Sequence, residues 1–213
     1  SDHDLRSWVI DQDGRDYEIR LAVHHEGSDE DVDAFLQMAK NVVDAQIEVF
    51  GELPEFDYGT YTFIADYLPW VSGDGMEHRN STILASTQSF VEAEFGQLGT
   101  LSHEFIHVWN VERIRPASLE PFDFERANMS PDLWFAEGFT SYYGQLTIHR
   151  AGESTLDEFT DSLSFWINTV TNAPGRRYFA PQGMSRRAPF VDAATAIDPV
   201  NFANTFVSYY TYG

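Results

Sequence analysis

The 213-residue sequence contains no cysteine, which excludes disulfide bonds, a thiolate nucleophile and sulfur ligands for a metal ion. Any bound metal must therefore be held by His, Asp or Glu side chains. Lysine is almost absent too, since Lys40 is the single lysine among 13 basic residues, against 34 acidic ones. The formal net charge of -21 repels phosphate backbones and anionic lipids, so we expect no nucleic-acid partner and no membrane contact.

Long apolar runs are also missing. The apolar stretches fall short of the roughly 18 residues that a membrane span needs, and the polar opening at residues 1–4 does not have the pattern of a signal peptide. We therefore expect a soluble chain without a targeting signal, and its compartment stays unknown. The last segment, residues 206–213, is apolar and well patterned, which leads us to expect a fragment of a longer protein.

The alternation of apolar and polar residues predicts an α+β fold, with a mixed β-sheet first and a helical half after it. We expect residues 1–90 to be mostly sheet with one helix and residues 91–213 to be mostly helical. Strands are predicted at residues 8–10, 17–23, 60–65 and 81–85, with a hairpin turn at Asp13-Gly14.

Helix signals are clear at four places. A helix capped at residues 28–31 ends at Gly51, a second covers about 97–110, a third starts at Ser130-Pro131 and runs to residue 151, and a capping box at residues 155–158 opens a fourth. Residues 172–190, rich in Pro and Gly, are predicted to be irregular. No linker divides the chain, so residues 1–213 are predicted to be one fragment of a single domain.

The sharpest local signal is the sequence His103-Glu104-Phe105-Ile106-His107, inside a predicted amphipathic helix. Residues four apart share a helical face, so both imidazoles can reach one metal ion at about 2.0–2.1 Å. Glu104 is placed to meet a water molecule on that metal. The alternative, two ordinary surface histidines, is weakened because the apolar stripe at Leu101, Phe105 and Val108 would partly bury them.

A catalytic zinc takes three protein ligands and leaves one position open, so a third ligand is needed. Glu137 is the candidate, because it lies in a strongly apolar helix with no basic residue before Arg150. An unpaired carboxylate there would be costly unless a metal or another partner compensated its charge.

Four segments in order resemble the glycyl aminopeptidase family of gluzincin zinc metallopeptidases. They are Gly75-Met-Glu-His-Arg-Asn-Ser-Thr82, Leu101-Ser-His-Glu-Phe-Ile-His-Val-Trp-Asn-Val-Glu-Arg-Ile-Arg-Pro116, Leu133-Trp-Phe-Ala-Glu-Gly-Phe-Thr-Ser-Tyr-Tyr143 and Val207-Ser-Tyr-Tyr-Thr-Tyr-Gly213. The resemblance implies a thermolysin-like catalytic domain whose helical half carries the HExxH helix. The family's flanking β domain and its frequent PDZ domain are expected to lie outside this chain.

The resemblance also implies the residues of the site. It gives one Zn²⁺ ion held by His103, His107 and Glu137, and Glu104 as the general base and acid. It places Glu77, with Gly75 and Met76, at the substrate's free α-amine, and Tyr210 at the oxyanion of the tetrahedral intermediate, with Tyr209 as the alternative if the register differs by one.

These residues together predict a zinc aminopeptidase that cleaves the first peptide bond of peptides or proteins with a free N-terminus. The resemblance suggests a preference for small residues such as Gly or Ala. Two alternatives stay open. One is an endopeptidase with the same zinc centre, in which Glu77 holds no amine. The other is a non-catalytic peptide-binding module, which the presence of Glu104 argues against.

The scarcity of lysine has two interpretations, codon bias and adaptation to salt, and we favour the second. A charge of -21 is self-repelling, and dissolved salt screens that repulsion. We therefore expect the melting temperature, measured by calorimetry, to rise from low salt to molar KCl. A melting temperature that stays flat or falls over this range would favour codon bias.

Overall fold

The computed structural model describes residues 3–213, and the chain divides into two compact units. The first unit consists of Ser1–Glu112 and Gly144–Ser154, and the second of Arg113–Tyr143 and Thr155–Gly213. One of the boundaries falls inside helix α3 (Thr140–Arg150).

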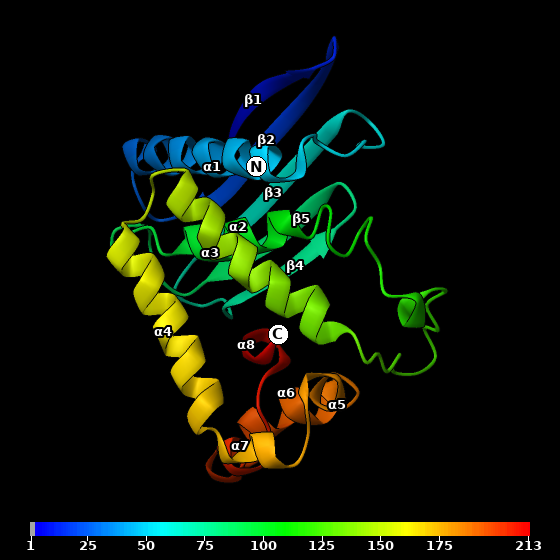
Figure 1. Ribbon diagram of the computed structural model, residues 1–213. Helices are drawn as coiled ribbons and strands as arrows, with labels where there is room; N and C mark the ends of the chain where they lie inside the picture. Colours follow the sequence, from blue (N-terminus) through cyan, green and yellow to red (C-terminus); the bar gives the residue numbers. More distant parts are fainter. Residues whose placement is uncertain (1–2) are drawn as a thin grey trace. The chain divides into compact units, whose positions relative to one another are not determined.

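The first unit contains a five-stranded mixed sheet in the order β1-β2-β3-β5-β4 (Figure 1). Its strands are β1 (Asp4–Gln12), β2 (Arg15–His25), β3 (Thr60–Tyr67), β4 (Asp74–His78) and β5 (Ser81–Ser86). The three central strands are parallel to one another, and β1 and β4 are antiparallel edge strands. The predicted strands are thus confirmed, but β4 was not predicted, because its short sequence follows Gly73, contains Gly75 and carries no alternating apolar pattern.

The hairpin and the first helix are confirmed with the predicted local chemistry. Asp13 and Gly14 both have positive φ, as a tight turn between twisted strands requires. Helix α1 (Asp29–Phe50) starts at a capping box in which Ser28 and Asp31 exchange side-chain-to-backbone hydrogen bonds. It ends at Gly51, which has φ 90°, a conformation that glycine adopts without strain.

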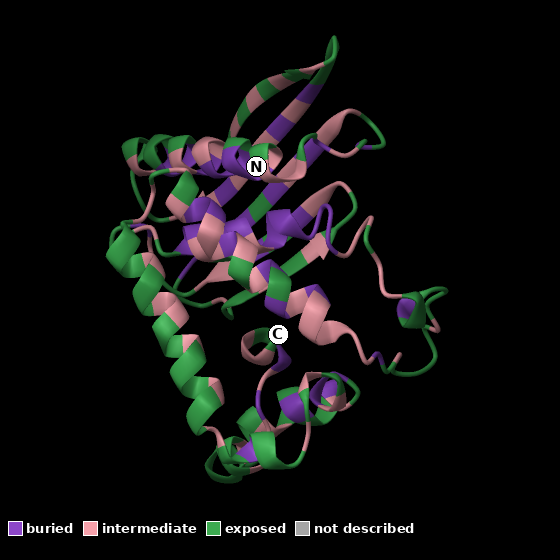
Figure 2. Cartoon of the chain, in the orientation of Figure 1, coloured by how far each residue is buried: buried purple, intermediate pink, exposed green. Residues whose placement is uncertain are grey.

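The main hydrophobic core lies between one face of this sheet and helices α1 and α2 (Gln97–Ile106). Every second residue of β2 and β3 is buried, which gives the banded strands of Figure 2. Phe105 of α2 packs edge-on against Tyr61, with ring centroids 5.1 Å apart, and against Phe63 at 5.4 Å. The aromatic contacts hold the predicted metal-binding helix against the sheet.

A buried polar group joins three helices of the first unit. The Gln46 side-chain amide of α1 donates to the Ser102 carbonyl and hydroxyl oxygens, both at 2.9 Å, and lies 3.3 Å from Thr147 Oγ1. The Ser102 hydroxyl in turn donates to the Gly144 carbonyl at 2.8 Å. These three side chains are fully buried, so each hydrogen bond also offsets a desolvation cost.

Helix α2 is shorter than predicted. It ends at Ile106, and His107 is its C-terminal cap. Beyond it the backbone tightens, since Val108 and Trp109 donate to the carbonyls three residues earlier. The apolar stripe continues through this turn, which is why the sequence pattern extended the helix to residue 110.

The second unit is helical. Its elements are η1 (Ala117–Leu119), η2 (Trp134–Phe139), α4 (Leu156–Asn172), η3 (Pro174–Arg177), α5 (Pro181–Ser185), α6 (Ala188–Ile197), α7 (Pro199–Thr205) and α8 (Tyr209–Tyr212). The capping box predicted for the start of α4 is present, with Thr155 and Glu158 as its members. A small core around Met184, Val191 and Val207 holds the C-terminal helices together.

The helix expected from Ser130 to residue 151 is confirmed in part. It begins later than predicted, with the π-helix Trp134–Phe139, and continues without a break as α3 to Arg150. The stretch 172–190 is not irregular, since it holds η3, α5 and the start of α6. Its three prolines stand in the first turns of these helices, where the missing N–H costs nothing.

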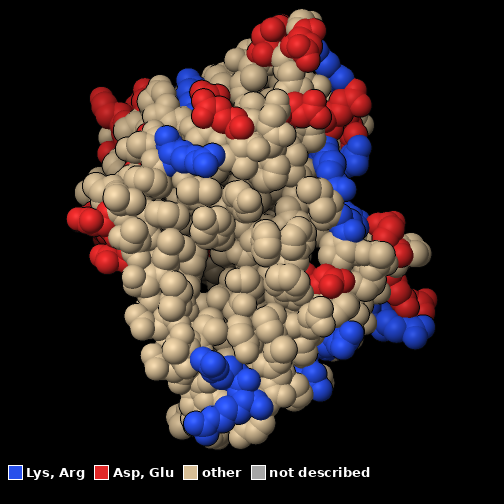
Figure 3. Space-filling model, viewed as in Figure 1, with Lys and Arg blue, Asp and Glu red and all other residues tan. Residues whose placement is uncertain are grey.

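None of the helices within residues 3–213 is long and apolar enough to cross a membrane. The surface charge is uneven, since on the face drawn in Figure 3 acidic and basic side chains gather side by side and much of the area carries neither. In the first unit Arg6 lies 2.7 Å from Asp33, and Arg79 lies 3.0 Å from Asp57. The few arginines thus neutralise part of the acidity locally.

Candidate active site

The two predicted histidine ligands lie together at the end of α2. The Nε2 atoms of His103 and His107 are 3.1 Å apart, and the two rings meet edge to face. His107 is almost fully buried, at 1% exposure, and its Nδ1 donates a hydrogen bond to the Asn110 carbonyl at 2.6 Å. That bond fixes the tautomer in which Nε2 carries the lone pair.

This histidine pair fits a zinc ion. Neighbouring ligands of a tetrahedral zinc are about 3.3 Å apart when each metal–nitrogen bond is about 2.0–2.1 Å long. The Nε2 separation of 3.1 Å is close to that value. Metal-bound histidines also commonly donate their other N–H to a carbonyl, as His107 does here to Asn110.

The Glu104 carboxyl group packs against the backbone of β4. Glu104 is buried, at 6% exposure, and a Cβ atom built on Gly75 would lie 2.8 Å from both Glu104 Cδ and Thr100 Cγ2. Only a residue without a side chain leaves room for this approach. The glycine at position 75 therefore sets how closely α2 and its carboxylate can lie to the strand.

Strand β4 also carries the predicted amine-binding residue. Gly75 and Glu77 pair with Leu84 and Thr82 of β5, which are fully buried, so they share the helix-covered face of the sheet. Met76 lies between them and points to the opposite face, with 51% exposure. Its side chain is thus apart from this group, while its carbonyl accepts a hydrogen bond from the Thr82 hydroxyl at 2.8 Å.

Three of the predicted residues converge within the first unit. One carboxylate oxygen each of Glu77 and Glu104 and one ring nitrogen of His107 lie within 4.8 Å of one another. Two carboxylates this close favour a bound cation between or beside them. Beside Gly75 a cavity of about 470 Å³ opens between β4, β5 and the start of α2.

The second unit brings Glu137 and the C-terminal tyrosines onto adjacent elements. Glu137 lies in the π-helix η2, and α8 packs on that segment. The contact is close, because a Cβ on Gly138 would lie 2.6 Å from Gly213 Cα. Two segments that are distant in sequence are thus held together by a pair of glycines.

The structure distinguishes the two adjacent tyrosines of α8. Tyr209 is buried, at 5% exposure, and donates to Asp192 at 2.9 Å. Burial and the neighbouring Asp192 raise the pKa of the Tyr209 hydroxyl far above its ordinary value. Tyr210 is 41% exposed and lines a largely aromatic cavity of about 530 Å³ with Phe139 and Trp166.

Two further residues orient this group and were not predicted from the sequence. Asn110 follows the histidine motif by three positions and offers its backbone carbonyl to His107. Gln46 is distant in sequence and binds the residue before His103. Neither could be found from spacing, because one acts through its backbone and the other only through tertiary contact.

Comparison with known proteins identifies the family. Residues 96–213 match the model of the M61 glycyl aminopeptidase family, which confirms the resemblance, and the chain belongs to this family. No curated protein matches the sequence.

Among solved structures, an aminopeptidase N family protein from Idiomarina loihiensis shares the fold, with a TM-score of 0.78 and 24% identity over 98% of this chain. The chain spans only 35% of that protein's length. An M1 zinc metallopeptidase from Deinococcus radiodurans is more distant, with a TM-score of 0.47 and 13% identity. The match covers 95% of this chain and 50% of the Deinococcus chain.

The packing at Gly75 leads to a stability prediction. Gly75→Ala should lower the free energy of unfolding by about 1–3 kcal/mol, because the added methyl group must displace Glu104 or Thr100. Gly73→Ala is the matched control, since its Cβ would meet nothing closer than the Ala85 carbonyl at 4.0 Å. Urea denaturation of both variants measures the difference, and equal stabilities would show that Gly75 is not needed for this packing.

Proposed function

We propose that the protein is a zinc-dependent aminopeptidase that hydrolyses the N-terminal peptide bond of peptides, with a preference for small first residues such as Gly or Ala. The observation that carries this proposal is the convergence of Glu77 and Glu104 on His107. One carboxylate serves the chemistry and the other sits beside it to hold the substrate's amine. Membership of the M61 glycyl aminopeptidase family supports the same activity.

His103 and His107 would hold one zinc ion, with Glu137 as the third ligand. The paired Nε2 atoms and the hydrogen bond of His107 to Asn110 support the first two assignments. The apolar surroundings of Glu137, between Trp134 and Phe139 of η2, favour a charge-compensating partner for its carboxylate. When bound, zinc supplies Lewis acidity that polarises the scissile carbonyl and acidifies a water molecule.

Glu104 is the general base in this proposal. Its carboxylate takes a proton from the attacking water and then returns it to the nitrogen of the leaving amine. Burial of Glu104 against Gly75 keeps the carboxylate in one position, so little ordering is needed during the reaction.

Tyr210 would donate a hydrogen bond to the oxyanion that forms at the carbonyl. Tyr209 is a poorer candidate because its hydroxyl is buried and already donates to Asp192. The exposure of Tyr210 on a cavity wall supports its assignment.

Glu77 would select the free amino end. Its carboxylate forms a charge-assisted hydrogen bond with an α-ammonium group, and its distance from Glu104 limits the substrate to one residue before the cleaved bond. The alternative function is that of an endopeptidase, which would have the same zinc centre but no contact between Glu77 and an α-ammonium group.

The role of Glu104 predicts a specific defect. Glu104→Gln should keep its zinc content and melting temperature, because the amide preserves the shape of the side chain, yet turnover should fall by at least about 100-fold. Metal analysis together with steady-state kinetics on glycyl and alanyl peptides measures both. Near-normal turnover would remove Glu104 from the proposed role.

The role of Glu77 predicts discrimination between free and blocked peptides. Acetylated peptides should be cleaved roughly tenfold to a few hundredfold more slowly than free ones, because the carboxylate then lacks its cationic partner. Glu77→Gln should reduce this ratio toward one by slowing free peptides. Glu26→Gln is the control, because it removes an exposed charge elsewhere in the first unit. This variant should keep the wild-type ratio of the two cleavage rates. Equal rates for both peptides in the wild type would favour the endopeptidase.

A further inference from the structure

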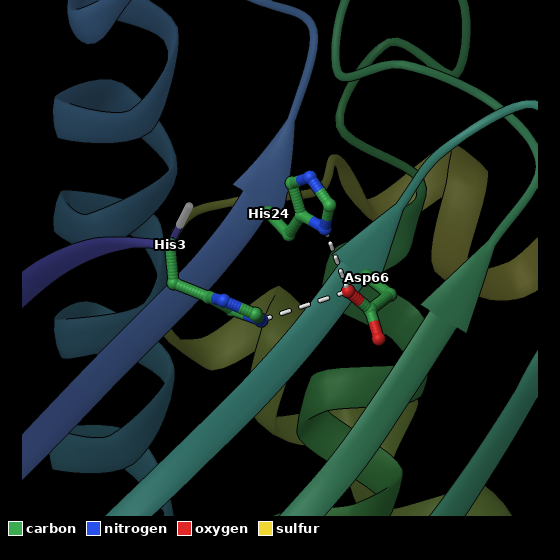
Figure 4. A group of neighbouring side chains, drawn as sticks. All are labelled: His3, His24 and Asp66. Atoms are coloured by element: carbon green, nitrogen blue, oxygen red, sulfur yellow. Dashed lines mark ion pairs between the residues drawn. The ribbon is translucent and has the colours of Figure 1, made fainter. Parts of the chain in front are cut away.

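A second cluster of metal-ligating side chains lies on the first unit, formed by His3, His24 and Asp66 (Figure 4). His24 Nδ1 is 3.3 Å from Asp66 Oδ1, and His3 Nε2 is 3.6 Å from the same oxygen. The two imidazole rings lie 5.1 Å apart, centroid to centroid. One ligand atom from each residue lies within 4.8 Å of the others.

The strand register brings these three side chains into one row. His24 of β2 is paired directly with Asp66 of β3. Asp4 is paired with Val23, so the antiparallel register of β1, continued by one residue, sets His3 opposite His24. The row therefore crosses three neighbouring strands, and its geometry follows from the sheet itself.

This row lies on the sheet face away from the candidate active site. Val23 and Ala65, which precede His24 and Asp66, are fully buried under the helices, so the next residues point to the other face. Gly75 and Glu77 are on the helix-covered face, as their pairing with Leu84 and Thr82 requires. The two groups of ligating residues are thus separated by the sheet.

The geometry suits a divalent transition metal with nitrogen and oxygen ligands. Ligands of a tetrahedral zinc lie about 3.3 Å apart, and the two distances to Asp66 Oδ1 are 3.3 and 3.6 Å. Two imidazoles and one carboxylate are a donor set that zinc accepts. The side chains are 33%, 33% and 40% exposed, so a metal ion and a water molecule on its fourth position can reach them.

We propose that His3, His24 and Asp66 form a second zinc site, which ties the edge strand β1 to β2 and β3 on the open face of the sheet. The ion replaces two histidine–carboxylate contacts with three bonds to one centre. The net charge of -21 favours the binding of a cation at this surface. The site is independent of the proposed peptidase centre.

Zinc binding at this second site is tested in a variant that lacks the proposed catalytic zinc site. The double variant His103→Ala, His107→Ala removes the proposed catalytic ligands, and calorimetric titration with Zn²⁺ should then still find one bound ion per chain. Adding His24→Ala or Asp66→Asn should weaken this binding by at least about 100-fold, because even loss of a residue that only supports a ligand costs about 10–100-fold. His78→Ala, an exposed histidine on the far edge strand β4, should leave it unchanged.

His3→Ala guards against misfolding as an explanation, since His3 precedes the first strand and its loss leaves the core intact. It should weaken Zn²⁺ binding as the other ligand variants do, and its melting temperature without metal should match that of the background. The absence of zinc binding in the background, or binding that His24→Ala and His3→Ala both leave intact, would overturn the proposal. If the proposed peptidase centre is wrong instead, the wild type will show no turnover, or it will bind one zinc ion in place of two.

Discussion

The hydrogen bonds of Gln46 are the constraint on which the first unit depends. A single buried amide binds the backbone of α2 one residue before His103 and also approaches Thr147 of α3. An unsatisfied N–H donor at this depth would be costly, so the three helices must keep the spacing that satisfies the Gln46 Nε2 group. The aromatic contacts of Phe105 hold α2 on the sheet, but they allow sliding that these directional bonds do not.

Local chemistry explains which parts of the fold the sequence could predict. The capping boxes at Ser28 and Thr155 and the turn at Asp13-Gly14 involve residues close in sequence, and each is present in the structure. The π-helix η2 packs against α8, which lies far along the chain, so its sequence alone does not signal it. Strand β4 pairs with the strand that follows it, with His78 opposite Ser81, and was missed for a different reason. Strand β4 exists because β5 offers it an edge, and no pattern within its five residues signals that pairing.

The candidate site follows the same division. The spacing of His103 and His107 could be recognised because a helix fixes it. The place of Glu77 beside His107 could be expected only from the family resemblance, since it requires β4 to lie against α2 at Gly75. The resemblance assigned Tyr210, with Tyr209 as the alternative, because adjacent tyrosines differ by only one residue of register. Burial and the contact with Asp192 separate them.

The π-helix η2 has a consequence for aligning this chain with a relative in which the same segment is an uninterrupted α-helix. A π-helical turn arises when one residue is added to an α-helix without disturbing the turns on either side. The segment Trp134–Phe139 therefore behaves as a one-residue insertion ahead of α3. Alignment by helical periodicity loses its register within this segment, and a one-residue gap placed there would restore it without any shift in the residues after Thr140.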